Sequence, residues 1–223
     1  MPVLQKAGGA AALYLAAAYV IGITLFIVVL DYPNMTDAAA RVALLADKPM
    51  VIFATNLILY VIFGIVLIVL VMAIYDLLKS HSPALVTAAS IIGIIWAGSL
   101  IASGMVLNAG IDLTLGLHVT DPVQAALVWA QFEAVSSGLG NGNGEILGGL
   151  MTLLFSWAGL GANRFPKVLN YLSVVVGLVG MVTTVPGLND LASVFAIGQI
   201  FWFVGLAIVM LLPNPVRGPS GRH

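Results

Sequence analysis

The chain has 223 residues and a hydrophobic fraction of 61%, whereas only 8% of its residues are charged. Soluble domains carry roughly 25% charged residues, so a water-soluble fold of this size would have too few charges to cover its surface. The net charge of −1 gives no attraction for phosphate, and the lack of cysteine removes disulfides and thiolate metal sites. Composition therefore excludes a soluble enzyme, a disordered chain and a nucleic-acid binder, and it indicates a protein embedded in a lipid bilayer.

Long apolar segments divide the chain into six predicted membrane spans. A helix crosses the hydrocarbon core with about 20 apolar residues, and backbone groups in lipid must be hydrogen-bonded internally, which favours helices over strands. The expected spans are 7–30, 50–74, 84–107, a fourth that ends near residue 160, 168–185 and 191–212. We therefore expect an all-α membrane helical bundle, with one transmembrane domain over 1–212 and a polar cytoplasmic tail over 213–223.

Basic residues at the span ends predict the orientation of the chain, because cytoplasmic loops carry an excess of Lys and Arg. With the N-terminus in the cytoplasm, Arg41 and Lys48 fall outside. The basic residues that then fall inside are Lys6, Lys79, Arg164, Lys167, Arg217 and Arg222. We therefore expect a multi-pass protein of the cell membrane with both termini in the cytoplasm.

The two outer loops contain predicted short amphipathic helices. Residues 36–48 have a helical pattern that Thr36 can cap and that Pro49 ends. In the other loop Asp121 precedes Pro122, and proline is favoured at the first position of a helix, so a helix should begin at Pro122. Its expected apolar face contains Val128, Trp129, Phe132 and Val135.

The Gly- and Asn-rich stretch at 138–145 has two interpretations. As a loop, its alternating glycines form a flexible hinge. As a helix, it places Gly140, Gly144 and Gly148 on one face, where small residues allow close helix contact. Residues 146–161 alone would span only about 24 Å of a core that is about 30 Å thick, which favours a fourth span that starts near Asn141.

Polar side chains inside the spans are costly and usually face the interior of a bundle. Five of them fall in the predicted outer half of the membrane, namely Asn56, Asn108, Asn141, Glu145 and Gln199. One interpretation is an outward-facing pocket that binds a small molecule, an ion or a lipid headgroup. The other is a set of interhelical hydrogen bonds that only stabilise the bundle.

No residue set for catalysis or for a cofactor is recognisable in the sequence. The serines within the spans have no intramembrane His or Lys to act as a base, and no span contains a histidine that would ligate haem. The ligand cluster of a zinc-dependent intramembrane hydrolase is also absent, and His118 with Asp112 and Asp121 in the second outer loop is too loosely spaced to be more than weak evidence for a divalent-metal site. The sequence therefore favours a protein that is not an enzyme and that has no cofactor and no metal.

Two short stretches carry a resemblance to a known family. Lys-Ala-Gly-Gly at 6–9, followed by Leu13 and Tyr14, opens the first span, and Arg-Phe-Pro-Lys-Val-Leu at 164–169 enters the fifth. With the chain length and the layout of the spans, they make residues 6–213 resemble a bacterial family of six-helix integral membrane proteins of unknown function. The resemblance implies a protein of the bacterial inner membrane, and it transfers no activity and no site residue.

Three functional hypotheses follow from these patterns. The first is a non-catalytic helical scaffold or accessory subunit, which acts through helix–helix contacts in a homo-oligomer or a larger membrane complex. The small-residue face of Gly140, Gly144 and Gly148 favours it. The alternative is a binding protein or carrier for a small molecule or lipid, which requires Asn56, Glu145 and Gln199 to converge. An intramembrane enzyme is the third and weakest hypothesis.

Overall fold

The computed structural model describes residues 2–140 and 145–212, and every regular element in these ranges is helical. The helices are α1 (Val3–Ile23), α2 (Ala38–Asp47), α3 (Pro49–Asn56), α4 (Phe63–Leu78), α5 (Pro83–Thr120), α6 (Pro122–Leu139), α7 (Glu145–Ala162), α8 (Lys167–Val182) and α9 (Leu191–Leu211). A π-helical turn over Thr24–Val29 extends α1, another over Leu57–Ile62 joins α3 to α4, and a 3-10 turn covers Tyr32–Asn34. The predicted all-α class is thus confirmed for the described residues.

Five stretches are long and apolar enough to cross a membrane. They are Val3–Val29, Pro49–Leu78, Pro83–Thr120, Glu145–Ala162 and Leu191–Leu211. Helix α8 is apolar but has only 16 residues, which corresponds to about 24 Å. The five stretches indicate a multi-pass membrane protein, whereas the sixth span expected over 168–185 is not confirmed.

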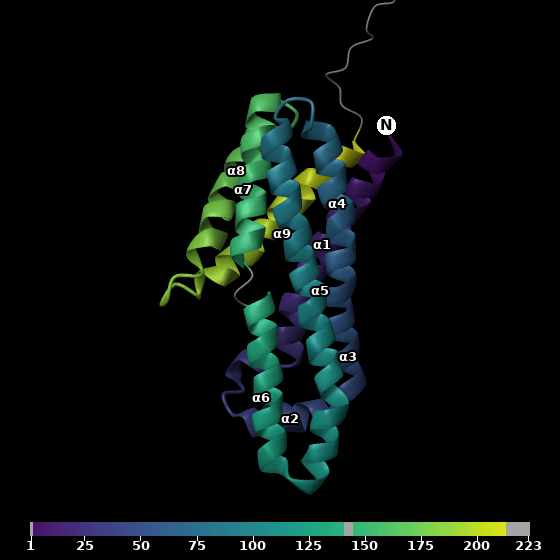
Figure 1. Ribbon diagram of the computed structural model, residues 1–223, viewed down its shortest axis with the longest axis vertical. Helices are drawn as coiled ribbons and strands as arrows, with labels where there is room; N and C mark the ends of the chain where they lie inside the picture. Colours follow the sequence, from purple (N-terminus) through teal and green to yellow (C-terminus); the bar gives the residue numbers. More distant parts are fainter. Residues whose placement is uncertain (1, 141–144, 213–223) are drawn as a thin grey trace, which may run out of the picture.

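The helices are arranged so that the predicted cytoplasmic segments share one end of the molecule. The N-terminus, the α4–α5 turn, the α7–α8 connection and the last turn of α9 lie together at the upper end in Figure 1. Helices α2 and α6 and the α5–α6 turn lie at the opposite end. This partition agrees with the predicted alternation of the loops, but the side of the membrane that each end faces stays a prediction.

Helix α5 is much longer than its predicted span. It has 38 residues and ends at Thr120 rather than near residue 107, so it is about 57 Å long. The prediction of a loop between residue 108 and Asp121 is therefore wrong. Leu107, Ile111 and Thr114 are buried at spacings of four and three residues, so they lie on one face of the helix. Helix α6 packs against this part of α5.

A second packed unit, which we call the cap, consists of α2, α6 and residues 107–120 of α5. Its hydrophobic core is separate from that of the remaining helices, which we call the bundle. The buried residues of the cap core, including one that α3 contributes, are Val42, Leu45, Ile52, Leu107, Ile111, Ala125 and Trp129. The expected apolar face of α6 is only partly correct, because Trp129 and Phe132 pack in this core but Val135 is 53% exposed.

The short helices begin where local hydrogen bonds dictate. The Asp121 carboxylate accepts a hydrogen bond from the Gln124 backbone N–H at 3.0 Å, so α6 begins at Pro122 as predicted. In α2 the cap is Asp37, whose carboxylate accepts from the Ala39 N–H at 3.1 Å. The expectation that Thr36 caps this helix is therefore wrong by one residue, since an Asp carboxylate is the better acceptor at the positive end of a helix.

Small residues allow two bundle helices to touch through their backbones. A Cβ atom on Gly149 of α7 would lie 2.6 Å from the carbonyl oxygen of Gly177 on α8. Gly148 is likewise closed in, because a Cβ there would lie 2.8 Å from the Trp96 ring and 3.0 Å from the Phe195 ring. Gly140 ends α6 and so belongs to a different helix from Gly148, and Gly144 lies outside the described residues.

Candidate functional site

A cavity of about 310 Å³, the cap cavity, lies between the cap and the bundle. Its walls come from the end of the first span, the following turn, α2, α3, the π-helical turn after α3, α5 and α6. The lining residues are Phe26, Leu30, Tyr32, Arg41, Ile52, Thr55, Asn56, Tyr60, Leu107, Trp129, Glu133 and Ser137. Most are apolar or aromatic, but an ion pair is among them.

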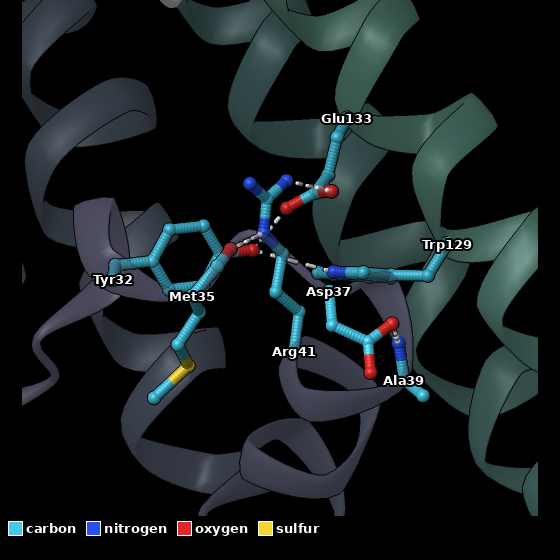
Figure 2. Close-up of polar contacts among 7 residues, drawn as sticks. All are labelled: Tyr32, Met35, Asp37, Ala39, Arg41, Trp129 and Glu133. Atoms are coloured by element: carbon cyan, nitrogen blue, oxygen red, sulfur yellow. Dashed lines mark hydrogen bonds and ion pairs between the residues drawn. The ribbon is translucent and has the colours of Figure 1, made fainter.

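The ion pair joins the two short helices of the cap (Figure 2). Arg41 Nη1 of α2 lies 2.9 Å from Glu133 Oε2 of α6. The Nε of Arg41 donates to the Met35 carbonyl at 2.8 Å, which fixes the guanidinium against the chain that leads into α2. Because Asp37 caps α2 one turn before Arg41, the helix start sets where the guanidinium lies.

Tyr32 connects this ion pair to the cap core. Its hydroxyl donates to Glu133 Oε1 and accepts a hydrogen bond from Trp129 Nε1 at 3.4 Å. The Arg41 guanidinium carbon lies 5.3 Å from the centre of the Tyr32 ring, which is a cation–π distance. Both carboxylate oxygens of Glu133 thus accept a hydrogen bond, and the charges of Arg41 and Glu133 are paired with each other. The network therefore stabilises the cap.

Burial raises the pKa of Tyr32 well above its usual value, and the hydrogen bond to Glu133 and the charge of that carboxylate raise it further. The folded protein therefore binds the phenolic proton more tightly than the unfolded chain does. The stability that the protonated Tyr32 contributes is fully present below a pH of about 10, the ordinary tyrosine pKa. It is lost as the pH rises through the higher pKa that Tyr32 has in the folded protein.

We expect Glu133→Gln to lower the free energy of unfolding by about 2 kcal/mol, because it leaves Arg41 without its anionic partner. Breaking a fully buried pair costs about 3–5 kcal/mol, and the effect is smaller here because the Arg41 and Glu133 side chains are 30% and 18% exposed. Unfolding by SDS in mixed micelles, followed by tryptophan fluorescence, measures the loss. The exposed Asp112 of α5 supplies the control, since Asp112→Asn should change stability by less than about 0.5 kcal/mol. Equal stability of the two variants would contradict the assigned role of Glu133.

A second cavity of about 290 Å³, the bundle cavity, adjoins the first and shares Phe26 and Tyr60 with it. Its walls come from α1 and its extension, the π-helical turn before α4, the end of α6, and α4, α5, α7 and α9. The lining residues are Ala18, Tyr19, Gly22, Ile23, Phe26, Ile27, Leu59, Tyr60, Phe63, Trp96, Leu100, Gly140, Glu145, Phe195 and Ala196. Among these described residues Glu145 is the one ionisable group besides tyrosines.

Glu145 differs from Glu133 in its partners. Its Oε2 atom is buried and has no hydrogen-bond partner among the described residues. A buried polar atom without a partner is unfavourable, and a cavity beside it has room for a molecule that supplies one. The bundle cavity thus combines an apolar, aromatic wall with a single unmet acceptor, which is the usual composition of a small-molecule site.

The structure separates the residues that the sequence grouped into one pocket. Asn56 lines the cap cavity and donates through Nδ2 to Asn108 Oδ1 at 3.0 Å, whereas Glu145 lines the bundle cavity. Gln199 is buried outside both cavities and donates through Nε2 to Thr152 Oγ1 at 2.9 Å. Asn56 and Gln199 thus make interhelical hydrogen bonds through their amide nitrogens. Glu145 Oε2 lines a cavity and has no hydrogen-bond partner among the described residues. Asn141 lies outside the described residues.

Sequence reasoning missed Arg41, Glu133 and Tyr32 as a group. Arg41 and Glu133 are 92 residues apart, and Tyr32 and Glu133 are 101 apart, so no spacing rule links them. One signal was present, because each of the two predicted amphipathic helices carries one of these charges, and both helices were expected on the outer side, where opposite charges favour pairing.

Comparison with known proteins gives no relative for this chain: no protein-family model matches it, and neither a curated protein nor a solved structure is significantly similar.

Proposed function

We propose that this chain is a multi-pass protein of the cell membrane, with both termini in the cytoplasm, that binds a small molecule in the bundle cavity. The observation that carries the proposal is the unpartnered Glu145 Oε2 atom in the wall of a cavity of about 290 Å³. A carrier needs such a site within its helical bundle, and polar groups in membrane spans mark ligand pathways.

The geometry favours binding over the scaffold hypothesis because the small residues are used inside the chain. Gly149 packs against Gly177, and Gly148 packs against Trp96 and Phe195. These two positions are therefore occupied by internal contacts and are not available to a partner helix. This supports the binding hypothesis as the better account of Glu145.

A single introduced cysteine tests occupancy of the cavity, because the chain has no cysteine of its own. Ala196 is half-buried in the cavity wall on α9, and Ala192, also half-buried, lies one turn earlier and outside the wall. The labelling rate of Ala196→Cys by a small neutral maleimide would be measured in protein washed free of bound molecules and reconstituted into nanodiscs. An organic extract of the source membranes is then added.

We expect the extract to slow labelling of Ala196→Cys about tenfold, since a ligand at about ten times its dissociation constant leaves roughly a tenth of the sites empty. Labelling of Ala192→Cys should be unchanged. Equal rates at Ala196→Cys with and without extract would refute the proposed function.

A further inference from the structure

Aromatic rings from several helices line the bundle cavity. Tyr19 and Phe63 meet edge to face, with ring centres 5.5 Å apart and planes at 76°, and Phe63 and Trp96 do the same at 6.2 Å and 74°. Tyr19, Phe63 and Trp96 thus line the cavity from three helices, with their rings at large angles to one another. The face of an aromatic ring carries negative potential and attracts a cation within about 6 Å.

The one ionisable side chain in this wall other than tyrosine is acidic. Glu145 is the first residue of α7, and its Oε2 has no hydrogen-bond partner among the described residues. None of the lining residues is Lys, Arg or His. The positive end of the α7 dipole favours negative charge at this position, and no basic side chain among the described lining residues pairs with the carboxylate.

The aromatic rings and the Glu145 carboxylate together indicate the charge and the shape of a ligand that would fit the cavity. An anion would be repelled by Glu145, and a purely apolar molecule would leave Oε2 unmet. A substituted ammonium ion meets both requirements, because its charge pairs with the carboxylate while its alkyl groups contact the ring faces. The volume of about 290 Å³ lies at the small end of ligand pockets and admits an apolar body beside the charge.

We propose that the ligand of the bundle cavity is a lipophilic ammonium ion, held by the Glu145 carboxylate and by the rings of Tyr19, Phe63 and Trp96. This inference rests on the proposed function and names the chemical class of its ligand. Because Ile27 lines the cavity and is 55% exposed, the cavity opens toward the surface of the first span, where an amphipathic cation dissolved in lipid would reach it.

The probe is phenylbutyl-trimethylammonium, and its comparator is the neutral analogue in which a quaternary carbon replaces the nitrogen. Protection of Ala196→Cys from the maleimide is measured in nanodiscs with each compound. The concentration of each compound in the bilayer is measured by its partition into protein-free nanodiscs. Two further variants in the same background, Glu145→Gln and Asp190→Asn, test the carboxylate. Asp190 is an exposed acid just before α9 that does not line the cavity.

We expect the cation to protect Ala196→Cys at about tenfold lower bilayer concentration than its neutral analogue. Glu145→Gln should remove this difference, and Asp190→Asn should keep it. Native mass spectrometry of the same samples should show one bound cation per chain, lost in Glu145→Gln, and the unfolding curve of that variant checks that it is folded.

The other outcomes separate the two proposals. Equal protection by the cation and its analogue, or a preference for the cation that survives in Glu145→Gln, would overturn the ammonium inference and leave a binding cavity in place. Protection by the membrane extract alone would also overturn it. If the extract does not protect Ala196→Cys, the proposed function fails, and the ammonium inference that rests on it fails too.

Discussion

Gly149→Ala is expected to lower the free energy of unfolding by about 2–3 kcal/mol, although it adds a single methyl group. The new Cβ would lie 2.6 Å from the Gly177 carbonyl oxygen and 2.9 Å from the Met181 backbone nitrogen. Both are backbone atoms, so relief requires α7 and α8 to move apart rather than a side chain to rotate. Overpacking of this kind costs about 1–3 kcal/mol, and here it also loosens the most extensive helix pair of the bundle.

The same helix provides a matched control for this substitution. A Cβ on Gly161 of α7 would meet no atom within 4 Å. Gly161→Ala should therefore be neutral or stabilise the protein by up to about 1 kcal/mol, because alanine is the better helix former. The comparison is made by SDS-induced unfolding of both variants in the same mixed micelles. Similar stabilities for Gly149→Ala and Gly161→Ala would show that α7 and α8 do not touch through their backbones.

Trp129→Ala is expected to unfold the cap while leaving the bundle folded. Trp129 is 2% exposed, packs in the cap core and donates a hydrogen bond to Tyr32. Truncating a buried Trp to Ala costs about 3–5 kcal/mol, and a core with only seven buried residues has little other packing to compensate. Hydrogen exchange should therefore accelerate in α2 and α6 but not in α7 and α8, since the two cores are separate.

Trp157 of α7 provides the control, because its side chain is 66% exposed. Trp157→Ala removes the same atoms from the surface and should leave exchange in the cap unchanged. Peptide-resolved hydrogen exchange by mass spectrometry distinguishes the two variants. A uniform rise in exchange over α2, α6, α7 and α8 in Trp129→Ala would mean that cap and bundle unfold as one unit.

The helical class and the position of α6 could be predicted because they depend on local chemistry. Apolar length identifies the spans, and the Asp121–Pro122 pair specifies where α6 begins. The length of α5 could not be predicted in the same way, because apolar length marks the part of a helix that crosses the membrane and not its continuation beyond the membrane. The buried spacing of Leu107, Ile111 and Thr114 shows that one helix can continue from one packed unit into the next.

The candidate site was predicted only in part, since its geometry depends on contacts between distant segments. Polar residues within spans are expected to face the interior of the bundle, and Asn56, Glu145 and Gln199 are indeed buried or half-buried. The position of a residue along its span predicts its depth in the membrane, but it does not predict which neighbouring helix the side chain faces. The structure therefore pairs Asn56 with Asn108 and Gln199 with Thr152, and it leaves Glu145 beside the open volume.

The packing of α1 against α9 sets an order of events during synthesis. Gln5 Nε2 donates to the Met210 carbonyl at 3.2 Å across 205 residues, and a Cβ on Gly9 would lie 2.6 Å from Leu211. At about 5–20 residues per second the ribosome needs roughly 10–40 s to make the intervening chain. Throughout that interval α1 resides in the bilayer without this neighbour. Lipid or an insertion chaperone must cover the face of α1 around Gly9 until α9 emerges from the translocon.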